Sequence, residues 1–428
     1  MHFLNKIKKS FRFIFEKDTI RELTKCDGLL ICHDDDRGDY KFGLPYSKYL
    51  DSVFEDLNSK GYLCKQFAPP LSFYIGKKAW AEPYSGNRTF IIVYVIGKIK
   101  NIFNLILNRN LLPSNFAHHF IYRKALEKSR PSFIIVIGAS AALCKAANTL
   151  NIPVLELLHG MGYDRIYWGW DKAPVENLPT HILSTDATST KTFSPLTSKG
   201  IKIIEIPHPW YKRFIKEAVK CNLDNKWLEK PKILPSNKKI ILVSISWGYD
   251  GDHSPIDYFY QDILPNGLLP LGLIKVIMQT QNDVFWCLRR HPVQVYNDKY
   301  DKQITFLNSI TREYQNCEWS ESTSSTLISL LSHCDGHITM NSMTSYDAAC
   351  MGVKSLLLCP TLKVGRENQY LFNDLVKDGY SEKGNFDEDS IAKWVKNVKK
   401  TIPFSYTSDN QTELSSLLLN LSNVALIL

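Results

Sequence analysis

The feature that most constrains the fold is an alternation of short apolar runs with helix-length segments. Helical spacing of apolar residues occurs at 47–61 and 140–151. Parallel strands need a long crossover between them, normally a helix, so the alternation predicts a doubly wound parallel sheet. The apolar runs of this first series lie at 28–33, 62–67, 133–138, 153–160, 181–186 and 201–209.

The alternation then occurs a second time, after a polar stretch at 222–239 that is rich in Lys, Pro and Asn. The apolar runs of this second series lie at 240–248, 284–292, 336–342 and 354–360. A chain of 428 residues is also longer than the roughly 250 to 300 residues that one core usually serves. We therefore predict an α/β protein with two Rossmann-like, doubly wound parallel-sheet domains. The predicted parts are an N-terminal domain (1–220), a linker (221–239) and a C-terminal domain (240–428), whose last helix is free to pack back on the first domain.

The composition is that of a globular chain, with 44% hydrophobic and 22% charged residues. A net charge of +9 with scattered Lys and Arg suits an anionic substrate or a membrane surface better than a nucleic acid, so no nucleic-acid partner is expected. The ten cysteines include no CxxC pair. This spacing favours buried thiols in a reducing compartment over zinc or disulfide sites.

Two segments raise the question of membrane contact. The leader (1–16) mixes basic and aromatic residues and lacks the apolar core of a signal peptide; a short helix on an anionic bilayer and a solvated leader both remain open. The apolar window 90–107 is broken by Lys98 and Lys100. An amphipathic helix is therefore expected there rather than a membrane span.

Ligands of open α/β sheets bind at the carboxyl ends of the strands, so polar residues that follow the apolar runs are the candidates for chemistry. The first run (28–33) is followed by three aspartates and an arginine. Crowded carboxylates raise one another's pKa, which suits a general acid or base. We therefore predict catalytic roles for Asp35 and Asp34 and acceptor binding by Asp36 and Arg37. A solvated turn with Asp36 paired to Arg37 is the alternative, and no metal is expected because consecutive side chains rarely converge on one ion.

A second candidate group follows the run at 153–160. His159 ends this run and is flanked by glycines, which let a ligand approach the backbone. A histidine here can act as a base for a hydroxyl or donate to a phosphate. His159 is thus a catalytic candidate, and Tyr163 and Arg165 are acceptor-binding candidates. A histidine satisfied within the core is the alternative.

In the second series, the run at 284–292 ends in two arginines, a histidine and a proline. Pro292 ends the strand because it has no N–H. Arginine offers forked donors to phosphate oxygens, and histidine adds one more. Side chains alternate along a strand, so Arg289 and Arg290 point to opposite faces. We predict that His291 is the principal phosphate contact and that Arg290 supports it.

Hydroxyl-bearing residues follow two further runs of the second series. Backbone N–H groups and hydroxyls at a helix start favour an anion, although an ordinary helix cap would use the same residue types. The predicted donor-binding residues here are Ser246, Asn341, Ser342, Thr344 and Ser345.

The motifs "LHG" (158–160), "LRRHP" (288–292) and "CDGHITMNSMTSYDAACMG" (334–352) resemble those of bacterial envelope transferases of GT-B fold. These include CDP-glycerol glycerophosphotransferases, sialyl- and polysialyltransferases, and Kdo transferases. The resemblance implies two Rossmann-like domains that face a central cleft. It also implies that His291 and the Ser342–Ser345 turn hold the CMP part of a cytidine donor and that Glu367 binds a hydroxyl of the donor. UDP and GDP sugars remain open as donors.

The resulting expectation is a metal-independent glycosyltransferase that acts in capsule or O-antigen assembly. It would use a nucleotide sugar as co-substrate, with no cofactor, and a glycan or lipid-linked glycan as acceptor. We expect a cytoplasmic protein, with peripheral contact at the inner face of the membrane left open. A CDP-polyol phosphotransferase, a non-catalytic nucleotide- or glycan-binding scaffold and a sugar-nucleotide epimerase are the alternatives.

Overall fold

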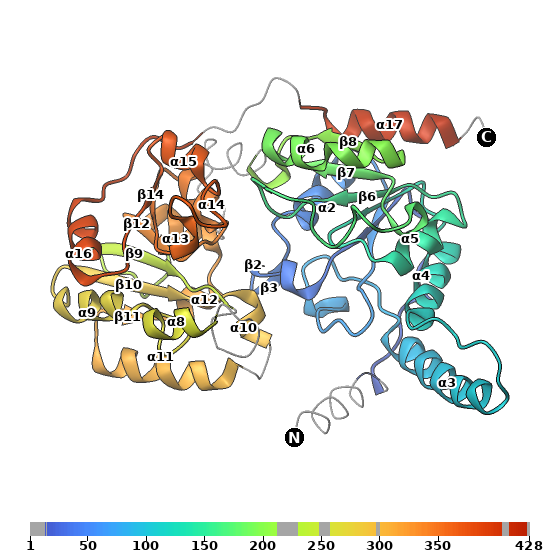
Figure 1. Cartoon of the computed structure of the whole chain (residues 1–428), viewed down its shortest axis with the longest axis horizontal. Helices are drawn as coiled ribbons and strands as arrows, with labels where there is room; N and C mark the ends of the chain where they lie inside the picture. Colours follow the sequence, from blue (N-terminus) through green and yellow to red (C-terminus); the bar gives the residue numbers. More distant parts are fainter. Residues whose placement is uncertain are drawn as a thin grey trace. The chain divides into compact units, whose positions relative to one another are not determined.

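The computed structural model describes residue 13 and residues 15–211, 230–247, 257–296, 300–404 and 411–425. The chain divides into two compact units (Figure 1). The first unit contains residues 1–37, 44–210 and 408–428, and the second contains 38–43 and 211–407. Most of the leader (1–16) and residues 221–229 of the expected linker lie outside the described residues.

The first unit is built on a six-stranded parallel sheet in the order β4-β1-β5-β6-β7-β8. All six apolar runs of the first series form strands of this sheet, so the prediction of a doubly wound parallel sheet is confirmed. The strands are β1 (Gly28–Ile31), β4 (Cys64–Gln66), β5 (Phe133–Val136), β6 (Val154–Leu157), β7 (His181–Ser184) and β8 (Lys202–Glu205). The short strand β3 (Leu44–Tyr46) also belongs to this unit.

Helices cover both faces of this sheet, which explains why its strands are almost continuously apolar. Leu29 and Ile134 point into one core and Leu30 and Ile135 into another, because side chains alternate along a strand. The first core includes residues of α4 and α5, and the second includes residues of α2 and α17. The helices of the unit are α2 (Leu50–Ser59), α3 (Asn87–Ile106), α4 (Phe116–Ser129), α5 (Ala141–Asn148), α6 (Ala187–Phe193) and α17 (Leu414–Ala425).

The second unit has its own six-stranded parallel sheet in the order β11-β10-β9-β12-β13-β14. The sequence predicts β9 (Lys239–Ser244), β10 (Val284–Arg289), β12 (Gly336–Thr339) and β13 (Lys354–Leu357). It does not predict the edge strands β11 (Cys317–Glu318) and β14 (Ser381–Lys383), which are short and partly charged and so carry no apolar run. The short strand β2 (Asp39–Lys41) also belongs to this unit.

Helices of the second unit pack around this sheet and complete the α/β class that the sequence predicts. They are α8 (Asp257–Ile263), α9 (Leu271–Gln279), α10 (Pro292–Tyr296), α11 (Asp301–Glu313), α12 (Ser320–Ser324), α13 (Leu327–His333), α14 (Thr344–Cys350), α15 (Asn373–Lys377) and α16 (Glu388–Asn397). The cysteines within the described residues of both units are buried free thiols, as their scattered spacing predicts.

Candidate functional site

A cavity of about 430 Å³ lies at the carboxyl ends of three adjacent strands of the first unit, β1, β5 and β6. Loops that follow these strands meet there because parallel strands end at the same edge of a sheet. The cavity is lined by His33, Asp35, Asp36, Ile137, Gly138, Ala139, Ala141, His159, Trp168, Trp170, Ala173 and Asn177. Asp35, Asp36 and His159, which the sequence singles out from two distant segments, are thus brought together.

The three aspartates that follow β1 form a short 3-10 turn, and they do not share one environment. Asp34 does not line the cavity. Its carboxylate accepts a hydrogen bond of 2.6 Å from the Phe73 N–H and another from the Ser72 hydroxyl. Asp34 therefore holds the neighbouring loop, and a catalytic role for it finds no support in this geometry.

Asp35 and Asp36 both line the cavity, and both have a raised pKa. Burial is the largest cause of the raised pKa of Asp35, and the negative charge of Asp36 raises this pKa further. Burial also raises the pKa of Asp36, against the opposing effects of His159 and His33. These two carboxyls and the two imidazoles therefore form one electrostatically linked group, of the kind that exchanges protons with a ligand.

The floor of the cavity depends on a buried carboxyl that the sequence analysis does not single out. Glu156 on β6 is fully buried and accepts hydrogen bonds from the N–H groups of Gly138 (2.8 Å) and Ala139 (2.7 Å). Burial raises the pKa of Glu156 to about 8, although the two N–H groups lower it. The signal was present in the sequence as one acidic residue inside the apolar run 153–160.

One side of the cavity is aromatic. The rings of Trp168 and Trp170 lie 4.9 Å apart between centroids, and the ring of His159 lies 6.3 Å from that of Trp168. Ligand cavities commonly combine such apolar walls with a few polar groups. These tryptophans were not predicted; the aromatic-rich "YWGW" at 167–170 was the available signal.

Three predicted acceptor-binding residues do not line this cavity. Arg37 is buried and donates to both carboxylate oxygens of Asp51, at 2.8 and 3.2 Å, and to Gln66. This places Arg37 in a structural ion pair, and its partner is Asp51 rather than Asp36. The ring of Tyr163 packs against Phe193, and Arg165 lies over the ring of Tyr167, 5.0 Å from its centroid.

In the second unit, the two arginines at the end of β10 have different surroundings. Arg289 is fully engaged: it donates to the carbonyls of Ser322 (2.7 Å) and Ser325 (2.6 Å) and lies 3.6 Å from the carboxylate of Asp39. The guanidinium of Arg290 lies over the Trp319 ring, 5.7 Å from its centroid. The Arg290 Nε is buried without a hydrogen-bond partner among the described residues.

His291 follows Arg290, and its side chain is a neutral imidazole that can donate a hydrogen bond. Its backbone N–H donates to Gln294 (2.7 Å), and its Nδ1 accepts from the Val293 N–H (3.2 Å). Burial, with Arg289 as a second cause, lowers the pKa of His291 to about 4. Because Nδ1 accepts a hydrogen bond in the neutral ring, the proton lies on Nε2, which can donate to a ligand.

Hydroxyl groups lie beyond the ends of β9, which pairs with β10, and of β12, which pairs with the other side of β9. The Ser342 hydroxyl contacts that of Thr344 at 2.8 Å. The hydroxyls of Ser246 and Ser345 are buried and have no partner among the described residues. Buried polar atoms are normally hydrogen-bonded. We define Ser246, Arg290, His291 and Ser345 as the candidate phosphate-binding group, which is called the phosphate-binding group below.

The two remaining predicted donor residues lie in loops. Asn341 is half-buried, two residues after the end of β12, and Glu367 is exposed in the loop that follows Pro360–Leu362.

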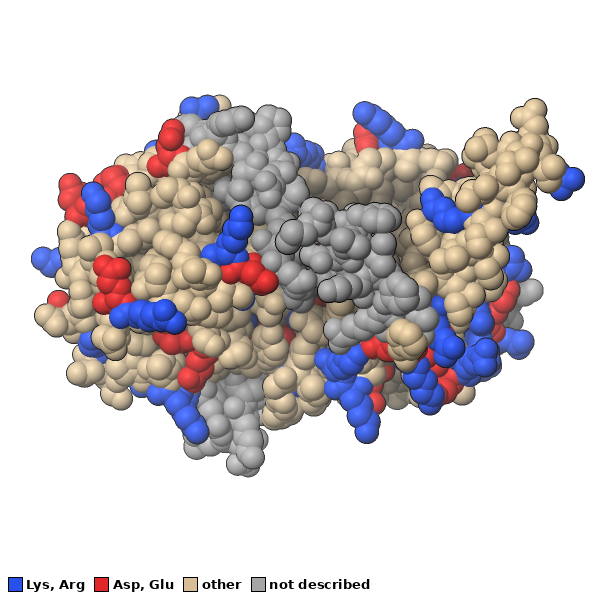
Figure 2. Space-filling view, turned by 90° about the horizontal axis from the view of Figure 1, so that it is seen from below, with Lys and Arg blue, Asp and Glu red and all other residues tan. Residues whose placement is uncertain are grey.

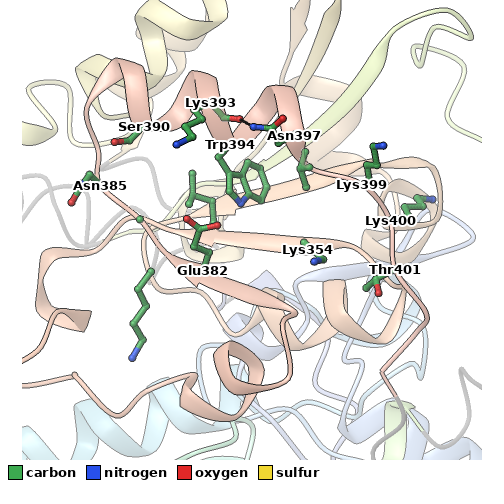
Figure 3. Close-up of a pocket in the computed structure, with 14 residues that line it drawn as sticks. Lys354, Glu382, Asn385, Ser390, Lys393, Trp394, Asn397, Lys399, Lys400 and Thr401 are labelled. Carbon is green, nitrogen blue, oxygen red and sulfur yellow. Dashed lines mark hydrogen bonds between the residues drawn. The ribbon is translucent and has the colours of Figure 1, made fainter.

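A second cavity, of about 660 Å³, runs along β14 beneath α16 (Figure 3). Trp394 lies at its centre, surrounded by lysines and by Glu382. Two of these lysines are engaged elsewhere, because Lys383 donates to Gln369 and Asn373 and Lys400 donates to Ser332. None of the predicted donor residues lines this cavity, so it is distinct from the phosphate-binding group.

No protein-family model and no curated protein matches this sequence. Solved structures do match. A UDP-GlcNAc 2-epimerase from Neisseria meningitidis, bound to UDP-GlcNAc, shares 13% identity over 94% of this chain and 100% of its own, with a TM-score of 0.52. The wall teichoic acid polymerase TagF shares 14% identity over 91% of this chain and 84% of its own, also with a TM-score of 0.52. The epimerase from Methanocaldococcus jannaschii shares 10% identity over 94% and 99%, with the same score. The fold is therefore the GT-B fold of two Rossmann-like units.

Proposed function

We propose that this protein is a glycosyltransferase of bacterial surface-polysaccharide assembly, acting in the cytoplasm. It transfers a sugar from a nucleotide donor, with a CMP-sugar favoured, to a glycan or lipid-linked glycan. The observation that carries the proposal is the cavity of the first unit, where Asp35, Asp36 and His159 converge beside two tryptophan rings. Titratable groups with raised pKa values in a cavity are typical of sites that move protons.

The first unit would bind the acceptor. In an inverting reaction, Asp35 or His159 takes the proton of an acceptor hydroxyl as its oxygen bonds to the anomeric carbon of the donor sugar. Asp36 lies in the same linked group, and its charge raises the pKa of Asp35. The tryptophan wall offers a flat apolar surface to a sugar ring. In a retaining reaction, no base is needed in this role.

The second unit would bind the donor. The bond between the anomeric carbon and the phosphate oxygen breaks, and the electron pair leaves with the phosphate. Arg290 supplies positive charge there, and neutral His291, Ser246 and Ser345 supply hydrogen-bond donors. Fixed donors aimed at developing negative charge are usually a large part of catalysis. Asn341, Ser342 and Thr344 would contribute the helix-start donors, and Glu367 would bind a hydroxyl of the donor.

A CDP-polyol phosphotransferase is the second candidate, because the same phosphate-binding group would serve it. TagF was soaked with CDPG in one of its structures, and this supports testing a cytidine diphosphate donor as well as a CMP-sugar. The two reactions differ in their products: a phosphotransferase makes a phosphodiester, and a glycosyltransferase makes a glycosidic bond.

The test is calorimetric titration of the purified protein with CMP, CDP, UMP, UDP and GDP, repeated on His291→Ala. Cytidine preference that is lost in the variant supports the proposal. Preferential UDP or GDP binding contradicts the cytidine donor, and failure to bind any nucleotide contradicts the whole proposal.

Measurements of turnover then distinguish the remaining candidate functions. Transfer to a glycan acceptor that stops in Asp35→Asn or His159→Ala supports a glycosyltransferase. Nucleotide binding with no transfer and no loss of cellular function in these variants indicates a scaffold. Interconversion of a sugar nucleotide without an acceptor indicates an epimerase.

A further inference from the structure

Helix α3 carries a continuous stripe of apolar side chains that the protein leaves exposed. The stripe residues are each between 46% and 72% exposed, and they recur at intervals of three and four, which puts them on one helix face. We define the α3 stripe as Ile92, Val95, Ile96, Ile99, Ile102, Phe103 and Ile106. Apolar residues scattered singly over a surface need no explanation, but a contiguous apolar face marks an interaction surface.

The opposite face of α3 is already occupied. Phe90 packs against His118 of α4, with ring centroids 4.6 Å apart. Gly97 lies against Phe116, and Asn101 exchanges hydrogen bonds with the backbone of Leu112. Figure 1 shows α3 projecting away from the sheet of the first unit, with α4 beside it. The helix is therefore held by one face and presents the stripe on the other.

The charges around the stripe are all of one sign. Between Glu82 and Glu127 the sequence contains no Asp or Glu, whereas it contains six Lys and Arg. Lys98 and Lys100 stand one residue on either side of Ile99, so each lies about 100° from the centre of the stripe. In Figure 2 a tan lobe projects at the right edge of the molecule, at the end where α3 lies in Figure 1, with blue and no red atoms visible on it.

This pattern fits an anionic bilayer surface, with the helix lying in the plane of the interface. In that position the stripe enters the acyl region, and Lys98 and Lys100 reach the headgroups from its two edges. α3 is also the one described helix that is long and apolar enough to cross a membrane. A crossing helix, however, would bury both lysines near the bilayer centre and would have to leave its contacts with α4, both of which are unfavourable.

We propose that the α3 stripe, with its flanking lysines, docks the first unit on a membrane that carries anionic lipids. This inference does not depend on the catalytic proposal, because it uses none of the residues of the cavity or the phosphate-binding group. It gives a structural basis for peripheral membrane contact that is separate from the basic leader. An acceptor linked to a lipid would then be met at the membrane surface.

The test is co-sedimentation of the full chain with phosphatidylglycerol vesicles and with phosphatidylcholine vesicles. We expect at least about tenfold tighter binding to the anionic vesicles, weakened by salt. Ile99→Glu puts a negative charge, the same sign as that of the lipid headgroups, into the centre of the apolar stripe. This variant should bind the vesicles about tenfold more weakly or worse. Lys98→Gln with Lys100→Gln should remove the preference for anionic lipid and retain weak binding to both vesicle types.

The matched control is Leu271→Glu, because Leu271 is 51% exposed on α9 of the second unit. This variant should bind vesicles like the wild type, and all variants should keep the wild-type melting temperature because each position is exposed. Equal binding by Ile99→Glu and Leu271→Glu would overturn the proposal. So would a dimer that Ile99→Glu dissociates without any change in vesicle binding, since the stripe would then be covered by a second copy. Nucleotide binding should be unchanged in every variant, so a failure here is distinguishable from failure of the proposed function.

Discussion

The imidazole of His33 lies directly against the backbone of Gly138, so closely that a Cβ on Gly138 would be 2.7 Å from two atoms of the ring. Gly138 also has a φ of +82°, a conformation that other residues rarely adopt. The contact joins the loop after β1 to the loop after β5. The shape of the cavity in the first unit therefore depends on the absence of a side chain at this position.

Gly138→Ala should destabilise the first unit and also reduce activity. The positive φ alone costs about 1 to 3 kcal/mol, and the overlap with His33 adds to it. The measurement is the free energy of unfolding in urea. The matched control is Gly200→Ala, because Gly200 has a φ of +80° but open space around its Cα. An equal loss of stability in the two variants would mean that the contact with His33 is unimportant.

Glu156 should make stability depend on pH. Its pKa is raised from 4.5 to about 8 in the folded protein, so between these values the folded state holds a proton that the unfolded state releases. The stabilisation is complete below about pH 4.5 and is lost as the pH rises towards 8, with a slope of at most about 1.4 kcal/mol per pH unit. Glu156→Gln cannot titrate. Melting temperatures from pH 5 to 8 should therefore show the wild type losing stability relative to the variant, and parallel curves would contradict the assignment.

The buried pair of Arg37 and Asp51 should be important for stability and not for ligand binding. Removing one partner of a buried ion pair leaves an uncompensated charge, so Arg37→Met should cost about 3 to 5 kcal/mol in urea denaturation. Glu127→Ala, which removes an exposed pair with Arg123, is the control and should change stability by less than about 1 kcal/mol. If Arg37→Met is as stable as the wild type but no longer transfers to the acceptor, Arg37 binds the acceptor and this prediction is wrong.

Ser345 should affect ligand binding and stability in different ways. Its hydroxyl is buried without a described partner, so Ser345→Ala should leave stability unchanged or raise it. Loss of a hydrogen bond to phosphate should weaken nucleotide binding about 5- to 10-fold. Ser355→Ala is the reverse control, because the Ser355 hydroxyl bonds to buried His337 at 2.8 Å. That variant should lose stability and keep its affinity; calorimetry and thermal melting together test the pair.

Asp35→Asn should lower kcat by about 100-fold or more if Asp35 is the base. Burial and the charge of Asp36 raise the pKa of Asp35, so activity in the wild type should rise with pH through a pKa above the ordinary aspartate value. This fall in activity at low pH should be absent from the residual activity of Asp35→Asn. It should persist in Asp34→Asn, a substitution that is expected to change stability instead. If activity in Asp35→Asn still falls at low pH, the group responsible is His159 or Asp36 and not Asp35.

The sequence was most informative where local pattern reflects burial. Apolar runs identified all six strands of the first sheet and the four long strands of the second, because strands covered on both faces are almost continuously apolar. The edge strands β11 and β14 were not predicted because they have little apolar surface to bury. The strand-end rule likewise identified Asp35 and His159, which the fold brings to one cavity.

The partners of charged groups could not be read from sequence. Arg37 was expected to bind a ligand or to pair with its neighbour Asp36, but it pairs with Asp51 on α2. Asp34 and Asp35 are adjacent in sequence and yet one caps the loop at Phe73 while the other lines the cavity. Side-chain direction in a turn depends on backbone geometry that residue type alone does not specify.

The sequence by itself therefore determined the α/β class, the two parallel sheets and the strand ends at which chemistry was to be sought. Only the tertiary structure decided which polar side chains converge, that Glu156 holds the cavity floor, and that the apolar face of α3 stays exposed. The physical reason is that hydrophobic periodicity is a local property, set by which face of an element is buried. Hydrogen-bond partners and uncovered surfaces depend on segments far apart in the chain, which meet only when the fold is complete.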